Sequence, residues 1–136
     1  MIEEYLRKNE YYTIIDYSEG LILTSHGKIF KKIDKKDDNQ TGEYDFIEMP
    51  KSIFRDYEYI ELLNDKNQLH EFYIHYLVFV LFKNPFDKRF FRIRHKNGDT
   101  FDNRAENLKI QFKRKSRRFI EQYENAINLL LDEKFL

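Results

Sequence analysis

The chain has 136 residues, with 24 Lys and Arg, 24 Asp and Glu, and no Cys. This length fits one domain, residues 1–136, and the lack of Cys excludes disulfides and thiolate zinc sites. Hydrophobic residues make up 41% and aromatic residues 17%, which predicts a folded chain with a core of aromatic rings. The N-terminus lacks the pattern of a signal peptide and no apolar run reaches the length of a membrane span, so we expect a cytoplasmic protein with no membrane partner.

The balanced charge hides an asymmetry along the chain. Residues 88–118 contain twelve Lys or Arg and three Asp or Glu, a net charge of 12 − 3 = +9, so the remainder carries −9. Such a basic stretch either pairs with the acidic part of the chain as a solvated surface or contacts a phosphate backbone.

The first third of the chain predicts a short helix and a small β-meander. Ile2, Tyr5 and Leu6 give residues 1–12 one apolar side, as in a short amphipathic helix. Residues 12–15, 21–23 and 29–33 have the composition of strands, and the last two are separated by a turn at residues 25–28. Residues 34–41 are the most polar stretch and predict an exposed loop tip.

The middle of the chain predicts further strands and one helix. Residues 46–49 and 57–63 have strand patterns, and the second is expected to form a hairpin with residues 69–74. Apolar residues at helical spacing predict a helix from Ile74 to Phe82, which Asn84-Pro85 would end. His75 lies on this helix, and a lone His on an apolar helix is usually a satisfied core residue.

The stretch 91–110 contains the most distinctive pattern. An aromatic and basic strand ends at His95, and Asn97-Gly98 predicts a tight turn because both residues tolerate positive φ. Asp102 or Asn103 would cap a helix that starts here, with Glu106 reaching back in a capping box. Asn107 would then lie in the first turn of that helix and bond across the loop.

After residue 112, a basic run leads into a predicted C-terminal amphipathic helix at residues 119–131. Its apolar side would pack onto the domain or form the seam of a homodimer.

A family resemblance is carried by the fourteen-residue stretch 95–108. The matching residues are His95, Asn97, Gly98, Asp99, Asp102, Asn103, Arg104, Glu106, Asn107 and Leu108, at the spacing found in the core of the HNH endonucleases of phages and mobile introns. The resemblance implies an α+β protein in which β-hairpins precede a ββα-metal core and a C-terminal helix. It also implies that His95 is the general base, that Asn107 braces the loop, and that a divalent cation such as Mg²⁺ is the cofactor.

Two further segments resemble the same family. Residues 21–32 are similar to the N-terminal module that commonly precedes HNH cores and lies on DNA, which makes Lys28, Lys31 and Lys32 candidate phosphate contacts. Residues 73–78 are similar to the helix that family members place before the core. The resemblance leaves open that His75 points to the active-site side, although a satisfied core position is the favoured interpretation. The implied organisation is an N-terminal β module at 12–70, an HNH-like core at 71–112, and the basic run and helix at 113–136.

Two positions depart from the family pattern. Arg94 stands where the family often has a metal-binding Asp, and Ser116 stands near the second ligand position, amid cations. Magnesium prefers hard oxygen ligands, so we predict no metal ligand at these positions and weak or absent Mg²⁺ binding.

Three functions are consistent with these patterns. The first is a metal-dependent DNA endonuclease in which His95 activates water and Arg94 or Arg104 holds phosphate. The second is a DNA binder that keeps the fold without cutting, and the third is a phage-type inhibitor of a host defence protein. The candidate DNA contacts in the first two are Lys28, Lys31, Lys32, Lys96, Arg104, Lys113, Arg114, Lys115, Arg117 and Arg118.

Overall fold

The computed structural model describes residues 1–34, 44–63 and 66–113. The first sheet is an antiparallel meander in which neighbouring strands follow chain order. Its strands are β1 (Tyr12–Asp16), β2 (Leu21–Thr24), β3 (Ile29–Asp34) and β4 (Tyr44–Met49). A short 3-10 helix, η1 (Ile2–Tyr5), packs its buried Ile2 beside Ile22 and Phe30 of this sheet.

The rest of the described chain forms two smaller sheets and one α-helix. The second sheet contains β5 (Ser52–Phe54), β6 (Tyr57–Leu63) and β7 (Leu69–Tyr73). The helix α1 (Ile74–Phe82) follows directly. The antiparallel hairpin of β8 (Phe91–His95) and β9 (Leu108–Phe112) comes last, with the 3-10 turn η2 (Ala105–Asn107) just before β9.

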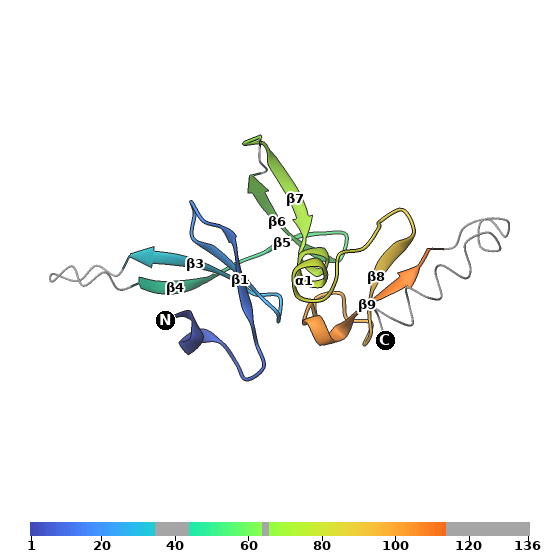
Figure 1. Cartoon of the computed structure of the whole chain (residues 1–136), viewed down its shortest axis with the longest axis horizontal. Coiled ribbons are helices and arrows are strands. Elements are labelled where there is room, and N and C mark those ends of the chain that lie inside the picture. Colours follow the sequence, from blue (N-terminus) through green and yellow to red (C-terminus); the bar gives the residue numbers. More distant parts are fainter. Residues whose placement is uncertain (35–43, 64–65, 114–136) are drawn as a thin grey trace.

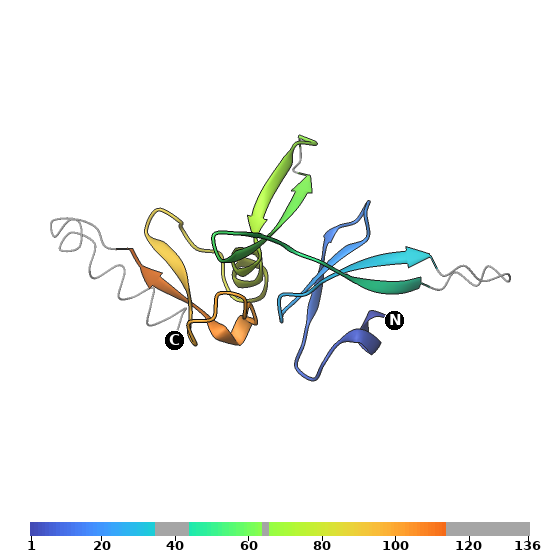
Figure 2. The ribbon, with the colours of Figure 1, turned by 180° about the vertical axis from the view of Figure 1, so that it is seen from behind.

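Helix α1 lies at the centre of the molecule. It stands between the four-stranded sheet and the β8–β9 hairpin, and the β6–β7 hairpin projects beyond it (Figures 1 and 2). One hydrophobic core joins the helix to all three sheets through Leu23, Leu62, Val78 and Leu108. The hairpin that carries His95 is therefore fixed against both the helix and the N-terminal sheet.

The centre of this core is aliphatic, so the expectation of a core of rings was wrong. Leu23, Ile29, Ile74, Val78 and Leu108 are fully buried, and the aromatic residues mostly pack around them. Many of the tyrosines are instead exposed, where the hydroxyl keeps its hydrogen bonds to water. The exposed tyrosines are Tyr5, Tyr11, Tyr12, Tyr17, Tyr44 and Tyr73.

The predicted strands of the N-terminal meander and of the 57–63 and 69–74 hairpin are confirmed, as is the helix at 74–82. The predicted helix over residues 1–12 was wrong beyond one 3-10 turn. Asn9 takes a positive φ of 63°, and the Glu10 carboxylate accepts the Arg7 amide, which turns the chain away from helical geometry. Strand β5 was not predicted, because its three residues are too few to show the alternation of apolar and polar side chains that indicates a strand.

The predicted helix after the loop was also wrong. The chain makes the single turn η2 and then continues as strand β9, in which buried Leu108 and Ile110 alternate with the exposed Lys109. This alternation is the signature of a strand, and it outweighed the capping pattern before it.

Other predictions lie outside the described residues. These are most of the polar loop at 34–41, the basic run from Arg114 to Arg118, and the C-terminal helix at 119–131 with its packing or dimer seam. Among the described helices, none has the length and apolar character needed to cross a membrane.

Candidate active site

His95 ends strand β8 at the start of a polar loop. Its side chain is buried, with 7% of the residue exposed. The loop begins with a tight turn in which the Gly98 amide donates to the His95 carbonyl at 3.1 Å. Gly98 has a positive φ of 77°, as predicted, but Asn97 does not. The turn therefore uses only the conformational freedom of the glycine.

Asn107 bonds across this loop, as predicted. Its side-chain carbonyl accepts the Asn97 amide at 3.1 Å, and its side-chain nitrogen donates to the Asn97 side chain at 3.0 Å and to the Asp102 carbonyl at 2.8 Å. Its backbone carbonyl accepts the Lys96 amide at 2.7 Å. One buried amide side chain thus ties both ends of the loop together, while a role for it in catalysis stays a prediction.

The predicted capping box does not form. Arg104 takes the N-cap position of η2 without a side-chain cap, and the Glu106 carboxylate accepts from Arg104 at 2.6 Å. Asn103, one of the two proposed cap residues, is instead buried with 2% exposed. Its amide points at His95, so this side chain serves the site and not the helix end.

A chain of polar contacts runs from His95 into the second sheet. The Nε2 atom of His95 lies 2.7 Å from Oδ1 of Asn103, and Nδ2 of Asn103 donates to the Glu58 carboxylate at 2.8 Å. The Lys51 ammonium lies 3.4 Å from the same carboxylate and donates to the Gly27 carbonyl at 2.8 Å. Sequence reasoning missed Glu58 and Lys51, because 45 residues separate Glu58 from Asn103 and no local pattern joins them.

The loop also docks on the N-terminal sheet. The Ala105 amide donates to the Ser25 carbonyl at 2.7 Å, in the turn between β2 and β3. Gly27 in this turn has a φ of 79°, and a Cβ built there would lie 2.8 Å from the Asn103 Cβ. The turn therefore approaches Asn103 as closely as a glycine allows.

His75 is part of the site, so its interpretation as a satisfied core residue was wrong. Its ring lies 5.3 Å from that of His95 and 5.2 Å from those of Tyr57 and Tyr73, by centroid distance. Its Nδ1 atom is buried without a hydrogen-bond partner. Burial, the nearby His95 and Lys88 lower the pKa of His75 from 6.5 to about 4, so this imidazole is neutral at pH 7.

The predicted arginines, Arg94 and Arg104, lie outside the buried group formed by His95, His75 and Asn103. Arg94 is exposed, and because neighbouring residues of a strand point to opposite faces, it lies on the face of β8 away from His95. Arg104 forms a two-bond fork with Asp102, at 2.8 Å for each bond, and this contact lowers the pKa of Asp102 to about 2. Lys96 is exposed at the start of the loop. The roles of Arg94, Arg104 and Lys96 in binding DNA stay predictions.

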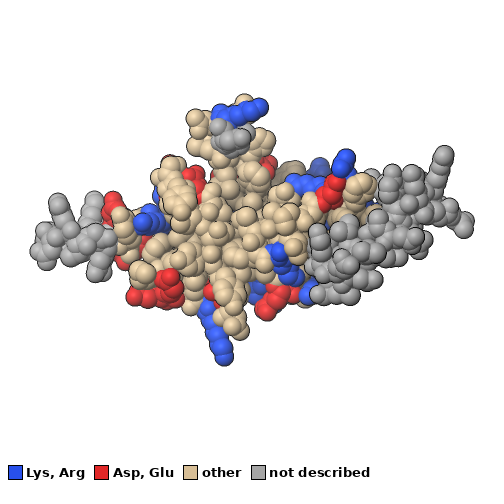
Figure 3. All heavy atoms as spheres, in the orientation of Figure 1, with Lys and Arg blue, Asp and Glu red and all other residues tan. Residues whose placement is uncertain are grey.

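The candidate lysines of the N-terminal module do not form one surface. Lys31 pairs with Glu19 at 3.6 Å, and Lys32 lies 3.6 Å above the Tyr44 ring on the other face of β3. Lys28 is half-buried in the β2–β3 turn. On the face shown in Figure 3, acidic and basic side chains are interspersed, so the charge asymmetry of the sequence does not become a purely basic side there.

A cavity of about 380 Å³ borders His75. The cations Lys88, Arg92 and Lys113 line it together with aromatic rings. Lys113 is the one member of the predicted basic run that the structure describes. This cavity therefore extends from His75 to Lys113, at the start of the basic run.

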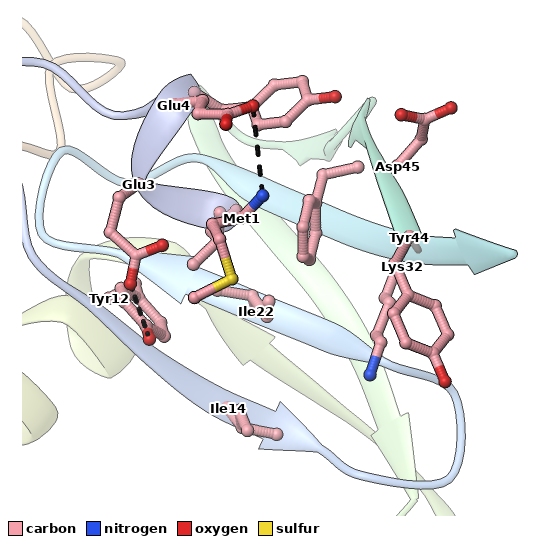
Figure 4. A pocket seen from close by; sticks show the side chains of 12 residues that line it. Met1, Glu3, Glu4, Tyr12, Ile14, Ile22, Lys32, Tyr44 and Asp45 are labelled. Atoms are coloured by element: carbon pink, nitrogen blue, oxygen red, sulfur yellow. Dashed lines mark hydrogen bonds and ion pairs between the residues drawn. The ribbon is translucent and has the colours of Figure 1, made fainter. Parts of the chain in front are cut away.

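A larger cavity, of about 690 Å³, lies between η1 and the first sheet. Glu3 and Tyr12 meet at its edge (Figure 4). Its lining comes from η1 and from strands of the first sheet and includes no histidine. It is therefore separate from the His95 site.

The described residues do not fit a magnesium site. Among residues 1–34, 44–63 and 66–113, no three His, Asp or Glu side chains come close enough to hold a metal ion. The side chains beside His95 include the rings of His75 and Tyr57 and the amide of Asn103, which is already engaged in hydrogen bonds. Mg²⁺ prefers carboxylate and water oxygens.

The arrangement of the sheets, the helix and the His95 loop defines the class as an HNH-like fold. The solved structure of the HNH homing endonuclease I-HmuI, described as showing DNA binding and cleavage, is similar to this chain with a TM-score of 0.51. Sequence identity is 16%, and the similarity covers 88% of this chain and 66% of that endonuclease. The chain therefore spans slightly less than two thirds of the length of I-HmuI. No protein-family model and no curated protein sequence matches the chain.

Proposed function

We propose that this protein binds DNA and hydrolyses a phosphodiester bond through His95, in the manner of an HNH endonuclease. The observation that carries the proposal is the placement of His95 at the end of β8, with Asn107 bonded across the loop, in an HNH-like fold. The structural neighbour binds and cleaves DNA, and a histidine held by a hydrogen bond at the end of a strand is suited to general-base catalysis.

The chemistry assigned to His95 is proton abstraction from water. The neutral imidazole takes one proton, the resulting hydroxide attacks phosphorus, and the bond to the leaving oxygen breaks while that oxygen gains a proton from solvent. General-base catalysis of this kind contributes about 10²- to 10⁴-fold to a rate. Because the described residues do not supply a magnesium ligand set, the steps assigned to this chain are those of His95.

A second candidate is a protein that binds DNA without cutting it. The observation that favours it is Arg94, a fixed cation where the family often carries a metal-binding Asp, exposed on the opposite face of β8 from His95. A phage or mobile-element origin, a cytoplasmic location in a host cell, a host protein partner and a homodimer are further proposals that rest on the sequence.

A plasmid-cleavage assay separates these candidates. Supercoiled DNA is incubated with Mg²⁺ or Mn²⁺ and the wild-type protein, the His95→Ala variant or the His70→Ala variant, while fluorescence anisotropy measures binding to a labelled duplex. His70 is an exposed histidine on β7 and serves as the matched control. We expect His95→Ala to lose cleavage by about 10²- to 10⁴-fold while binding is retained.

Equal cleavage by the wild-type and His95→Ala proteins would contradict the proposal. Binding that depends on salt, without cleavage by any of the three proteins, would establish the second candidate. Loss of both activities in the His70→Ala control would show that the assay reports on folding.

A further inference from the structure

The hydrogen bonds around Asn103 determine where the proton of His95 resides. A carboxylate only accepts hydrogen bonds, so the group that faces Glu58 at 2.8 Å must be the amide nitrogen of Asn103. The amide oxygen then faces Nε2 of His95 at 2.7 Å. This oxygen carries no proton, so Nε2 must donate. A neutral imidazole with its proton on Nε2 has its lone pair on Nδ1.

The amide of Asn103 has little freedom to take the reverse orientation. The residue is 2% exposed, and the close approach of Gly27 leaves no space beside its Cβ. A flipped amide would place its oxygen against the Glu58 carboxylate, where two acceptors meet without a proton. Its nitrogen could then donate to an unprotonated Nε2, so the contact with Glu58 is what selects the observed orientation. Lys51, at 3.4 Å from Glu58 and bonded to the Gly27 carbonyl, secures the far end of the chain of polar groups.

We propose that Asn103 and Glu58 are positioning residues that fix the tautomer of His95, so that Nδ1 is the nitrogen that receives the proton from water. The inference rests on the proposed function for the identity of the reaction, but the tautomer itself is independent of it. After proton transfer, Nδ1 carries the new proton and Nε2 still donates to Asn103. The amide thus holds the ring in one orientation before and after the step.

Two other side chains face the ring of His95. His75 contacts His95 from α1, and Tyr57 from β6 lies 6.2 Å away by ring centroids. Both approach His95 as rings against a ring, whereas Asn103 meets it through a hydrogen bond. The polar chain through Asn103 is therefore the feature that selects the tautomer.

Nuclear magnetic resonance tests the tautomer without any activity. In full-length protein with ¹⁵N-labelled histidine, at a pH where His95 is neutral, the shifts and two-bond couplings of the ring nitrogens identify which one is protonated. We expect Nε2 to carry the proton in the wild-type protein. In Asn103→Leu, which removes the acceptor, we expect a mixture of tautomers, whereas Glu61→Gln, an exposed carboxylate on the same strand as Glu58, should leave the spectrum unchanged.

A paired exchange tests the positioning role in catalysis. Asn103→Asp alone places two carboxylates side by side. Adding Glu58→Gln puts a donor at position 58 for the carboxylate at position 103, which still accepts from Nε2 of His95. We expect Asn103→Leu to lower cleavage by about 10- to 100-fold and the double variant to recover most of it. A carboxylate against the ring favours the charged imidazole, so the acid limb of its pH–rate profile should move to higher pH.

The outcomes separate this inference from the proposed function. A wild-type His95 protonated on Nδ1, or a tautomer that Asn103→Leu leaves unchanged, would overturn the inference even if the protein cuts DNA. An Nε2 proton that depends on Asn103, in a protein that never cuts DNA, would support the positioning role and reject the hydrolysis. Should Asn103→Leu fail to fold, Glu58→Gln supplies the test, because an amide at position 58 can donate as well as accept and no longer fixes the orientation of the Asn103 amide. Glu58 keeps 15% of its side chain exposed, so this change is the milder one.

Discussion

His75 shows that the neighbours of a residue in the sequence can give a wrong prediction of its surroundings in the structure. Its position on an apolar helix correctly indicated burial, but its ring contacts come from Tyr57, Tyr73 and His95 on three different strands. The buried Nδ1 without a partner means that protonation of this ring would place an unpaired charge inside the protein.

His75 should make the stability of the fold depend on pH. Its pKa falls from the ordinary value of 6.5 to about 4 in the folded protein. Between these values the unfolded chain therefore binds a proton that the folded protein does not. The contribution of His75 to stability is fully present above pH 6.5 and is lost as the pH falls toward 4, by up to about 2 kcal/mol at pH 5.

Urea unfolding at pH 7 and pH 5 measures this effect. We expect His75→Phe to lose less stability than the wild-type protein between these two pH values. His70→Phe, on exposed β7, should follow the wild type. A wild-type protein and a His75→Phe variant with parallel pH dependence would show that the ring is already protonated or solvated.

At the scale of elements, short sequence patterns predicted the strands and the helix whose formation depends mainly on their own residues. Apolar and aromatic runs in the sequence predicted seven of the nine described strands, all but β5 and β9, and the spacing from Ile74 to Phe82 predicted α1. The error after His95 arose where two local patterns competed, because Asp102 and Asn103 bond to Arg104 and His95 and do not cap a helix. The partners Glu58 and Lys51 could not be predicted, since they meet the loop through tertiary structure alone.

The turn between β2 and β3 offers a matched pair of glycine substitutions. Gly27 and Gly98 have nearly the same φ, 79° and 77°, but a Cβ at Gly27 meets Asn103 while a Cβ at Gly98 meets nothing within 4 Å. A non-glycine residue at positive φ costs about 1–3 kcal/mol. We expect Gly98→Ala to lower the free energy of unfolding by an amount near the lower end of this range. Gly27→Ala should lower it clearly more, because the Asn103 backbone must also move to make space for the new Cβ.

Thermal or urea unfolding of the two variants gives the comparison. The Gly27→Ala protein should also show altered histidine resonances for His95, while Gly98→Ala should not change the bond between Asn103 and His95. Equal losses of stability in the two variants would mean that the β2–β3 turn and the loop do not touch in solution.

For the whole molecule, the distribution of charge predicts how the affinity for DNA depends on salt concentration. Residues 88–118 carry a net charge of +9, and five of their cations lie in the run that starts at Lys113, so we expect DNA binding to depend on this run. Each cation that neutralises a phosphate contributes about 0.9 to the slope of log affinity against log salt for duplex DNA. Replacing Lys113, Arg114 and Lys115 by Ala should therefore flatten that slope by about 2.7.

A triple variant with the same change in net charge provides the control. Arg7, Lys8 and Arg55 are exposed on other parts of the molecule, and their replacement by Ala should change the slope little. Similar slopes for the two triple variants, measured by anisotropy over a range of NaCl concentrations, would show that the basic run does not bind the DNA backbone.

The contact between the β2–β3 turn and the His95 loop also limits how this protein can be recombined with others. A graft of residues 71–113 into a foreign scaffold would carry His95 and Asn103 but leave behind Glu58, Lys51 and the carbonyl of Ser25 that receives the Ala105 amide. The transplanted loop would keep its motif without the groups that orient it. A chimaera that preserves the site must begin upstream of β2. The transferable segment is therefore nearly the whole described chain.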